Sequence, residues 1–196
     1  MGRPRNTELR RAQIADAFIA VVADVGVDAA TVPAIAEAAG LSPGLVHYHF
    51  ETKDEILPLA IERLSLLLEM RIEGRLRAAG DDPRARLHAL VNAWLARDES
   101  ADPRAVRAWA ALGAAAARNA DVRALTAAFT GRVVERWERE VLAALSPERR
   151  ERARDIATTL VLGIEGALRV GTMSDALAPG DGARLGRALV DALLAP

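Results

Sequence analysis

The stretch AEAAGLSPGLVHYHF, residues 36–50, fits two patterns that belong to different classes of protein. Its centre, Gly40 to Gly44, has the form G-x-S-x-G, which is the nucleophile elbow of serine hydrolases. The same residues also fit a glycine turn between two short helices, in which Ser42 is the N-cap of the second helix and Pro43 its first residue. The sequence on either side decides between a nucleophile and a helix cap.

The segment before the turn is helical, which argues against the elbow. A hydrolase elbow needs a β-strand that leads into the turn, whereas residues 32–39 consist mainly of good helix formers. His47 and His49 follow on the same predicted helix rather than on a distant loop, so they are badly placed as triad partners. We therefore interpret Ser42 as a cap and expect no catalytic residue and no enzyme.

Helix signals continue along the whole chain. An N-cap residue followed by proline starts a helix at each of three further places, Asp82-Pro83, Asp102-Pro103 and Ser146-Pro147. Thr52 to Glu55 has the form of a capping box, and Gly26 stands where a glycine ends a helix. We expect an all-α protein of about nine helices, at residues 7–25, 32–39, 43–49, 53–78, 83–97, 103–117, 121–144, 147–173 and 182–194.

Composition limits the partners and the compartment. The chain has 196 residues, a net charge of −1 and no cysteine, so thiolate chemistry is excluded and any nucleic acid must meet a local basic patch. With three histidines, badly spaced, we expect no metal site, and nothing indicates a cofactor. The apolar runs fall short of the ~20 residues of a membrane span, and the start lacks a signal peptide. We expect a cytoplasmic protein.

The first fifty residues have the shape of a helix-turn-helix unit, because two short helices meet at a glycine turn. In such units the N-terminal residues of the second helix enter the major groove of DNA. The candidate DNA-contacting residues of this helix are Ser42, Pro43, Gly44 and Leu45, with His47, Tyr48 and His49 one turn later. Thr31 is the predicted N-cap of the helix before the turn.

Arginines are concentrated at the beginning of the chain. Arg3, Arg5, Arg10 and Arg11 are opposed only by Glu8. Such an arm can contact phosphates or enter the minor groove, and Arg3 and Arg5 are its candidates. A solubilising tail without a DNA contact would have the same composition.

Residues 31–57, TVPAIAEAAGLSPGLVHYHFETKDEIL, resemble the DNA-binding domain of TetR-family transcriptional regulators. The resemblance implies a helix-turn-helix domain over residues 1–52 and phosphate contacts near Thr31 and from Lys53, although an ordinary surface lysine is the alternative. Most relatives carry a tyrosine that reaches a phosphate where this chain has His47. Either His47 or Tyr48 takes that contact. The matched positions are Thr31, Ile35, Ala36, Gly40, Ser42, Gly44, Phe50 and Lys53.

The resemblance also implies that residues 53–196 form a helical domain for effector binding and dimerisation. LVLGIEGALRVGTM, residues 160–173, resembles the BetI-type subgroup, but Glu165 stands where an aspartate is more usual. A stripe of small residues in this helix would allow another helix to approach closely. Two such helices from each subunit would form a four-helix interface, unless both faces pack within one chain. The interface candidates are Thr159, Gly163, Ala167, Gly171, Leu185, Leu189 and Leu193.

Aromatic side chains on three successive helices are candidates for an effector pocket. Trp94, Trp109 and Phe129 either fill space beside the small residues 110–117 or line a cavity. Trp137 belongs to the same group of rings, with a half-exposed position in its charged run as the alternative. Glu165 either pairs with Arg169 or supplies a polar anchor for the ligand.

These features predict a homodimeric TetR-like regulator that binds a pseudo-palindromic double-stranded operator. Repression relieved by a small-molecule effector is the expected mode, although activation is open. The alternatives are a helical adaptor that binds protein without DNA and a small all-α enzyme.

Overall fold

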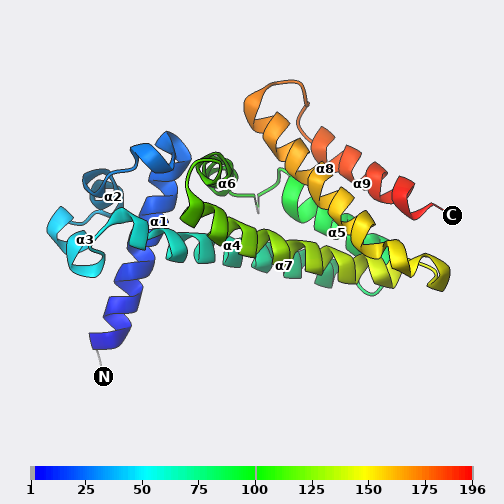
Figure 1. Cartoon of the computed structure of the whole chain (residues 1–196), viewed down its shortest axis with the longest axis horizontal. Coiled ribbons are helices and arrows are strands. Elements are labelled where there is room, and N and C mark those ends of the chain that lie inside the picture. The colour runs from blue at the N-terminus through cyan, green and yellow to red at the C-terminus, as the bar shows by residue number, and fades with distance from the viewer. Residues whose placement is uncertain (1–2, 100, 196) are drawn as a thin grey trace. The chain divides into compact units, whose positions relative to one another are not determined.

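The computed structural model describes residues 3–99 and 101–195, except for the side chains of residues 3–5. All regular elements in these ranges are helical, which confirms the all-α class (Figure 1). The elements are α1 (Arg3–Ala29), α2 (Val32–Ala39), α3 (Pro43–His49), η1 (Lys53–Glu55), α4 (Leu57–Ala79), α5 (Pro83–Leu95), α6 (Pro103–Ala116), α7 (Ala120–Ala144), η2 (Pro147–Arg152), α8 (Ala153–Met173) and α9 (Asp181–Leu194).

The chain forms two compact units. The N-terminal unit consists of Met1–Leu67 with Asp102–Ala127, and the C-terminal unit of Leu68–Ala101 with Ala128–Pro196. Helix α6 therefore belongs to the unit that holds the helix-turn-helix. The functional boundary expected after residue 52 is a different division and stays a prediction.

The core of the N-terminal unit is built from α1, α2, α3 and α6. The stripe that includes Ile14 and Phe18 on α1 meets Ile35 of α2 and Val46 of α3, and all four side chains are buried. Helix α1 makes its most extensive contacts with α6, through buried residues such as Leu112. The helix-turn-helix thus rests on α1, whose opposite side is covered by α6.

The core of the C-terminal unit lies between α5, α7, α8 and α9. Leu87 and Leu90 of α5 are fully buried, together with Val190 of α9 and Val141 of α7. Trp137 has only 1% of its surface exposed. The half-exposed alternative for Trp137 was wrong, because the apolar side of α7 at this point faces the core rather than solvent.

Four predicted caps are confirmed, but Ser146 makes no side-chain cap, and the segment after it is a 3-10 helix, Pro147–Arg152, before α8 begins at Ala153. The side chains of Thr31, Ser42 and Asp82 accept hydrogen bonds from backbone amides three residues later, and Asp102 accepts from the amide two residues later. The capping box was wrong: Thr52 makes no side-chain cap, and the Glu55 carboxylate accepts from the Glu51 amide at 3.1 Å. The segment after Thr52 is a 3-10 turn, and α4 begins only at Leu57.

Helix α1 begins earlier than predicted, and its continuous helical part ends at Gly26, as predicted. Gly26 does interrupt it, with φ of 82° and ψ of 168°, values that side chains with a Cβ rarely adopt. Beyond Gly26 the chain makes one more turn and ends at Ala29 without a glycine cap. The carbonyl groups at this end need other partners.

Candidate nucleic-acid interface and effector cavity

The turn between α2 and α3 has the geometry of a helix-turn-helix. Gly40 takes the left-handed conformation, with φ of 65°, and the Leu41 amide donates to the Ala36 carbonyl at 2.8 Å. Ala36 and Ala39 are buried. Their small side chains let α1 and α3 approach α2 closely.

Helix α3 presents one face to solvent and the other to the core. Val46 and Phe50 are buried, whereas Ser42, Pro43, Gly44, His47 and Tyr48 are exposed and Leu45 and His49 are half-buried. Tyr48 has 75% of its surface exposed, and its ring lies edge-on to His49 at 5.1 Å. A Cβ added at Gly44 would enter open space. The exposed residues are among those predicted to face DNA, and their contacts with it stay a prediction.

Side chains of α1 hold the ends of α2 and α3. The Arg11 guanidinium donates to the His49 carbonyl at 2.6 Å and lies 4.0 Å from the centre of the Phe50 ring. Gln13 donates to the Ala39 carbonyl at 2.7 Å. Arg11 is therefore engaged in fixing the recognition helix. The side chains of Arg3 and Arg5 lie outside the described residues, and their DNA contacts stay predictions.

Lys53 lies at the end of α1 rather than pointing freely into solvent. Its ammonium donates to the carbonyls of Val27, Asp28 and Ala30, at 3.0, 2.9 and 3.1 Å. An ammonium has three hydrogens, so a phosphate would have to replace one of these bonds. This role was not predictable from the sequence, because nothing in the local pattern links residue 53 to residues 27–30.

A cavity of about 330 Å³ lies between α4 and α7 in the C-terminal unit. Trp94 and Phe129 contribute neighbouring rings, with centroids 6.3 Å apart, and Trp137 adds a third. Charged side chains surround these rings, and an ion pair joins Arg136 of α7 to Glu73 of α4. The lining residues are Leu68, Glu69, Ile72, Trp94, Phe129, Arg132, Val133, Glu135, Arg136, Trp137 and Arg139.

The structure brings together only part of the predicted effector site. Trp94 and Phe129 line the cavity, whereas Trp109 packs against the core of the N-terminal unit. Glu165 is not part of the lining, and no Glu165–Arg169 ion pair occurs in the part of the chain described. Its side chain is exposed on the single chain, yet neighbouring apolar groups partly desolvate the carboxyl and raise its pKa. Trp137, the fourth ring of the predicted group, also lines the cavity.

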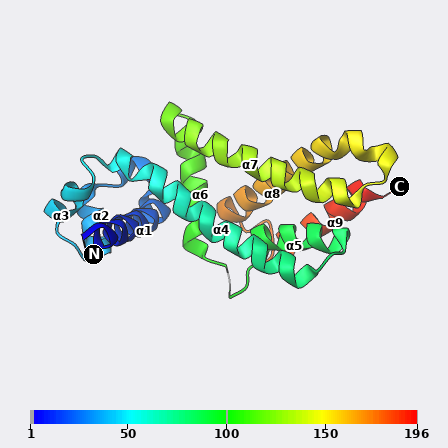
Figure 2. The same cartoon turned by 90° about the horizontal axis from the view of Figure 1, so that it is seen from below.

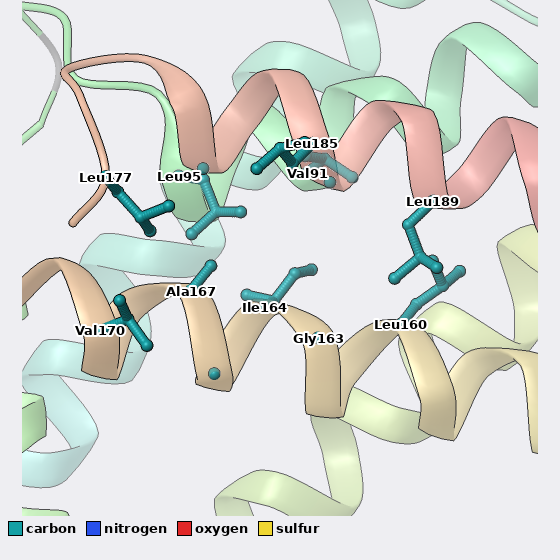
Figure 3. A pocket seen from close by; sticks show the side chains of 13 residues that line it. Val91, Leu95, Leu160, Gly163, Ile164, Ala167, Val170, Leu177, Leu185 and Leu189 are labelled. Atoms are coloured by element: carbon teal, nitrogen blue, oxygen red, sulfur yellow. The ribbon is translucent and has the colours of Figure 1, made fainter.

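A second, apolar groove of about 270 Å³ lies between α8 and α9, with α5 as its floor (Figure 3). Figure 3 shows Leu160, Ile164 and Ala167 of α8 facing Leu185 and Leu189 of α9 across it. A Cβ at Gly163 would lie 2.9 Å from the Leu189 Cδ2 atom. The close approach predicted from the small-residue stripe therefore occurs within one chain at this position.

The outer faces of α8 and α9 carry apolar side chains that the single chain leaves uncovered. Leu162 has 67% of its surface exposed, Met173 71% and Leu185 47%. Pro147–Met173 is long and apolar enough to cross a membrane by length and composition, and 28% of its most apolar window is buried. Of the predicted interface residues, Thr159, Gly163 and Leu185 are exposed, whereas Ala167, Gly171, Leu189 and Leu193 are half-buried.

Two family descriptions match the chain. Residues 14–59 match the bacterial regulatory proteins of the tetR family, and residues 83–195 match the C-terminal domain of BetI-type transcriptional repressors. The chain belongs to the TetR family. The first match covers the helix-turn-helix and the part of α1 from Ile14 onward, and the second covers the greater part of the chain, from α5 onward.

Curated relatives agree with this assignment. The HTH-type transcriptional regulator BetI of Burkholderia mallei (strain NCTC 10229) is 30% identical over 190 residues, which are 96% of this chain and 95% of the relative. BetI of Rhizobium meliloti (strain 1021) is 34% identical over 125 residues, 64% of this chain and 61% of that protein. The relatives are regulators of transcription, in keeping with a DNA-binding regulator.

Solved structures share the fold. A transcriptional regulator from Rhodococcus sp. Rha1 has a TM-score of 0.81 at 26% identity, covering 94% of this chain and 95% of that one. A regulator from Saccharomonospora viridis, solved in complex with choline, has a TM-score of 0.74 at 22% identity, with 95% of each chain covered. At that identity the second comparison supports the fold alone.

Proposed function

We propose that this TetR-family protein is a homodimeric repressor, acting in the cytoplasm, that leaves a pseudo-palindromic operator when a small molecule binds its C-terminal unit. The observation that carries the proposal is the exposed face of α3, with Pro43, Gly44, His47 and Tyr48 directed away from a buried Val46. A recognition helix of this kind enters the major groove. The BetI-type repressor match supports repression over activation.

A symmetric dimer presents two recognition helices, which is why we expect the operator to be pseudo-palindromic. The exposed apolar side chains of α8 and α9, such as Leu162, Met173 and Leu185, would be covered by the same face of a second copy. A helix that is apolar and only 28% buried in its central window needs such a cover. We place Thr159 and Leu185 within this interface, and Gly163, Ala167, Gly171, Leu189 and Leu193 behind or beside it.

The effector site of the proposal is the cavity between α4 and α7. Its rings, Trp94, Phe129 and Trp137, suit an apolar or aromatic part of a ligand. The charged rim, with Glu69 and Arg139 among its members, suits a ligand that also carries a polar group. Choline is the first compound to test, because a structural neighbour was solved with it and aromatic rings attract quaternary ammonium groups.

Binding to the DNA beside its own gene tests the regulator directly. A gel shift with this DNA, with an unrelated duplex of equal length as competitor, should show a specific complex. The alternatives give other results: an adaptor would bind neither duplex, and an enzyme would turn over a generic ester. Loss of the complex on adding a candidate effector would support repression with release.

A further inference from the structure

The helix-turn-helix lacks the side chains that usually form two-point contacts with base edges. Arginine and lysine bind guanine in this way, and asparagine and glutamine bind adenine. From residue 29 to residue 52 the sequence contains none of these four residue types, and α3 carries no acidic residue either. When α3 enters the major groove, it must therefore distinguish the bases by other means.

Helix α3 lies at the edge of the N-terminal unit, beside α1 and α2 (Figures 1 and 2). Val46 is fully buried on the inner side of the helix. With about 3.6 residues per turn, Gly44 and Tyr48 fall opposite Val46, and Leu45 and His47 flank them. Because Gly44 has no side chain, the side chains of this outer face are those of Leu45, His47 and Tyr48.

Leu45 is half-buried, as is Leu41 at the turn before α3. Leu41 packs against the core of the N-terminal unit, whereas in the described part of the chain Leu45 is not among the side chains that do so. Its neighbour three residues later is the exposed Tyr48, so the two side chains lie on the same side of the helix. Leu45 thus borders the outer face of α3 rather than filling the core.

The polar groups near this face have other roles. The Ser42 hydroxyl accepts a hydrogen bond from the Leu45 amide at 3.2 Å, as the cap of α3. One of His47 and Tyr48 is expected at a phosphate, as the resemblance implies. Leu45 has no polar group in its side chain, so an apolar contact is the only means of recognition open to it.

We propose that Leu45 reads a thymine in each half-site, by packing its methyl groups on the C5-methyl group of the base in the major groove. This inference rests on the proposed DNA-binding function. Among the four bases, thymine alone presents a methyl group there, and apolar side chains recognise it. Gly44 assists, because the open space beside its backbone lets the edge of the groove come close to the start of α3.

Deoxyuridine tests the contact, since it pairs as thymine does and lacks only the methyl group. Each symmetric pair of thymines in the footprinted half-sites is replaced in turn, and affinity is measured by gel-shift titration at one salt concentration. One position should show a loss of about fourfold per half-site, which corresponds to burial of one methyl-sized group. An operator in which no thymine responds to the replacement would overturn the proposal.

A double-mutant cycle assigns the methyl contact to Leu45. Leu45→Ala should bind the unmodified operator more weakly and be indifferent to deoxyuridine at the responding position. Tyr48→Phe is the matched control, because it keeps the ring of the neighbouring exposed residue and should keep the full loss. A loss that persists in Leu45→Ala would assign the methyl group to another side chain, such as Pro43, and overturn the proposal.

A measurement on the unaltered protein covers the case in which Leu45→Ala does not fold. In the complex, a nuclear Overhauser effect should join the methyl groups of Leu45 to that of the responding thymine, and its absence would overturn the proposal. Failure of the proposed function gives a different result: no specific complex forms with the unmodified DNA. A specific complex that is indifferent to every deoxyuridine contradicts the role of Leu45 alone.

Discussion

Gly163 of α8 faces Leu189 of α9 so closely that a Cβ at residue 163 would lie 2.9 Å from the leucine Cδ2 atom. This contact lies within one chain and fixes the pairing of the two helices that border the apolar groove. At this position the small-residue stripe of α8 therefore packs against α9 within the subunit. The exposed side of the same two helices remains for a second copy.

The first prediction concerns this contact. The Cδ2 atom ends a half-buried leucine side chain that can move, so Gly163→Ala should cost a small rearrangement that offsets part or all of the up to about 1 kcal/mol gained in helix propensity. The free energy of unfolding in urea, at one protein concentration, measures it. Gly131→Ala in α7 is the matched control, since its new Cβ meets open space, and it should stabilise. A Gly163→Ala protein as stable as the Gly131→Ala protein would place the tight contact elsewhere.

The second prediction concerns a part-buried ion pair of the C-terminal unit, in which the Glu140 side chain is buried and the Arg86 side chain is partly exposed. Arg86 donates to both oxygens of Glu140, at 2.7 and 2.8 Å, and Glu140 is 8% exposed. Arg86→Met leaves that carboxylate buried without its partner and should cost about 3–5 kcal/mol. Arg154→Met, which removes an exposed pair with Glu138, should cost about 1 kcal/mol or less. Equal losses in the two variants would show that the Arg86 pair is not desolvated.

The third prediction concerns pH. Desolvation raises the pKa of Glu165 above its ordinary value of 4.5. When the folded pKa is the higher one, the ionised carboxylate costs stability above the ordinary pKa, and the cost is absent where the group is protonated in both states. Glu165→Gln should therefore stabilise the protein at neutral pH but not near pH 3. Destabilisation at neutral pH would mean that the carboxylate has a favourable partner in the assembled protein.

The pKa of Asp181 is shifted in the direction opposite to that of Glu165, which gives a comparison. A hydrogen bond from Arg184 lowers its pKa below the ordinary value of 3.8. A lowered folded pKa contributes stability above the ordinary pKa, which is lost as pH falls through the folded pKa. Asp181→Asn should thus lower stability at neutral pH and have less effect in acid. Unfolding transitions of both variants across the acid range give the two opposite trends.

The fourth prediction separates the two cavities as effector sites. Val133→Trp would fill the cavity between α4 and α7, and Gly166→Leu would fill the groove between α8 and α9. Only Val133→Trp should abolish release of DNA by the effector while leaving operator binding intact. A gel shift with increasing effector measures this. Loss of the response only in Gly166→Leu would move the effector site to the groove.

The fold was predictable because its signals are local. Ser42 and Asp82 cap helices where a polar residue precedes proline, and Gly40 takes the left-handed turn that its position required. Contacts between distant residues were not predictable. Lys53 on the carbonyls of residues 27–30 and the burial of Trp137 follow from packing, which the spacing of residues along one helix does not record.

The candidate site was predictable to a similar extent. The face of α3 follows from helical spacing, so the exposure of His47 and Tyr48 and the burial of Val46 agree with it. The predicted effector residues lie on three helices, so they form one pocket only if those helices meet. Trp94 and Phe129 do meet, but Trp109 joins the core of the other unit, because α6 packs against α1.

The fifth prediction concerns Gly44 on the recognition helix. Because a Cβ added there meets open space, Gly44→Leu should fold with no loss of stability, and removing a glycine from α3 should add up to about 1 kcal/mol. The leucine side chain adds volume where α3 would meet the major groove and should abolish specific binding to DNA. Thermal unfolding and a gel shift measure the two effects. Unimpaired binding would show that Gly44 does not face the groove.

Footprinting on the DNA beside its own gene tests the central claim most directly. A dimer with two recognition helices should protect a pseudo-palindrome at saturating protein, with half-site centres ~34–36 Å apart, and the protection should vanish with Gly44→Leu. Protection of a single asymmetric half-site, or no protection at a salt concentration where other specific regulators bind, would contradict it.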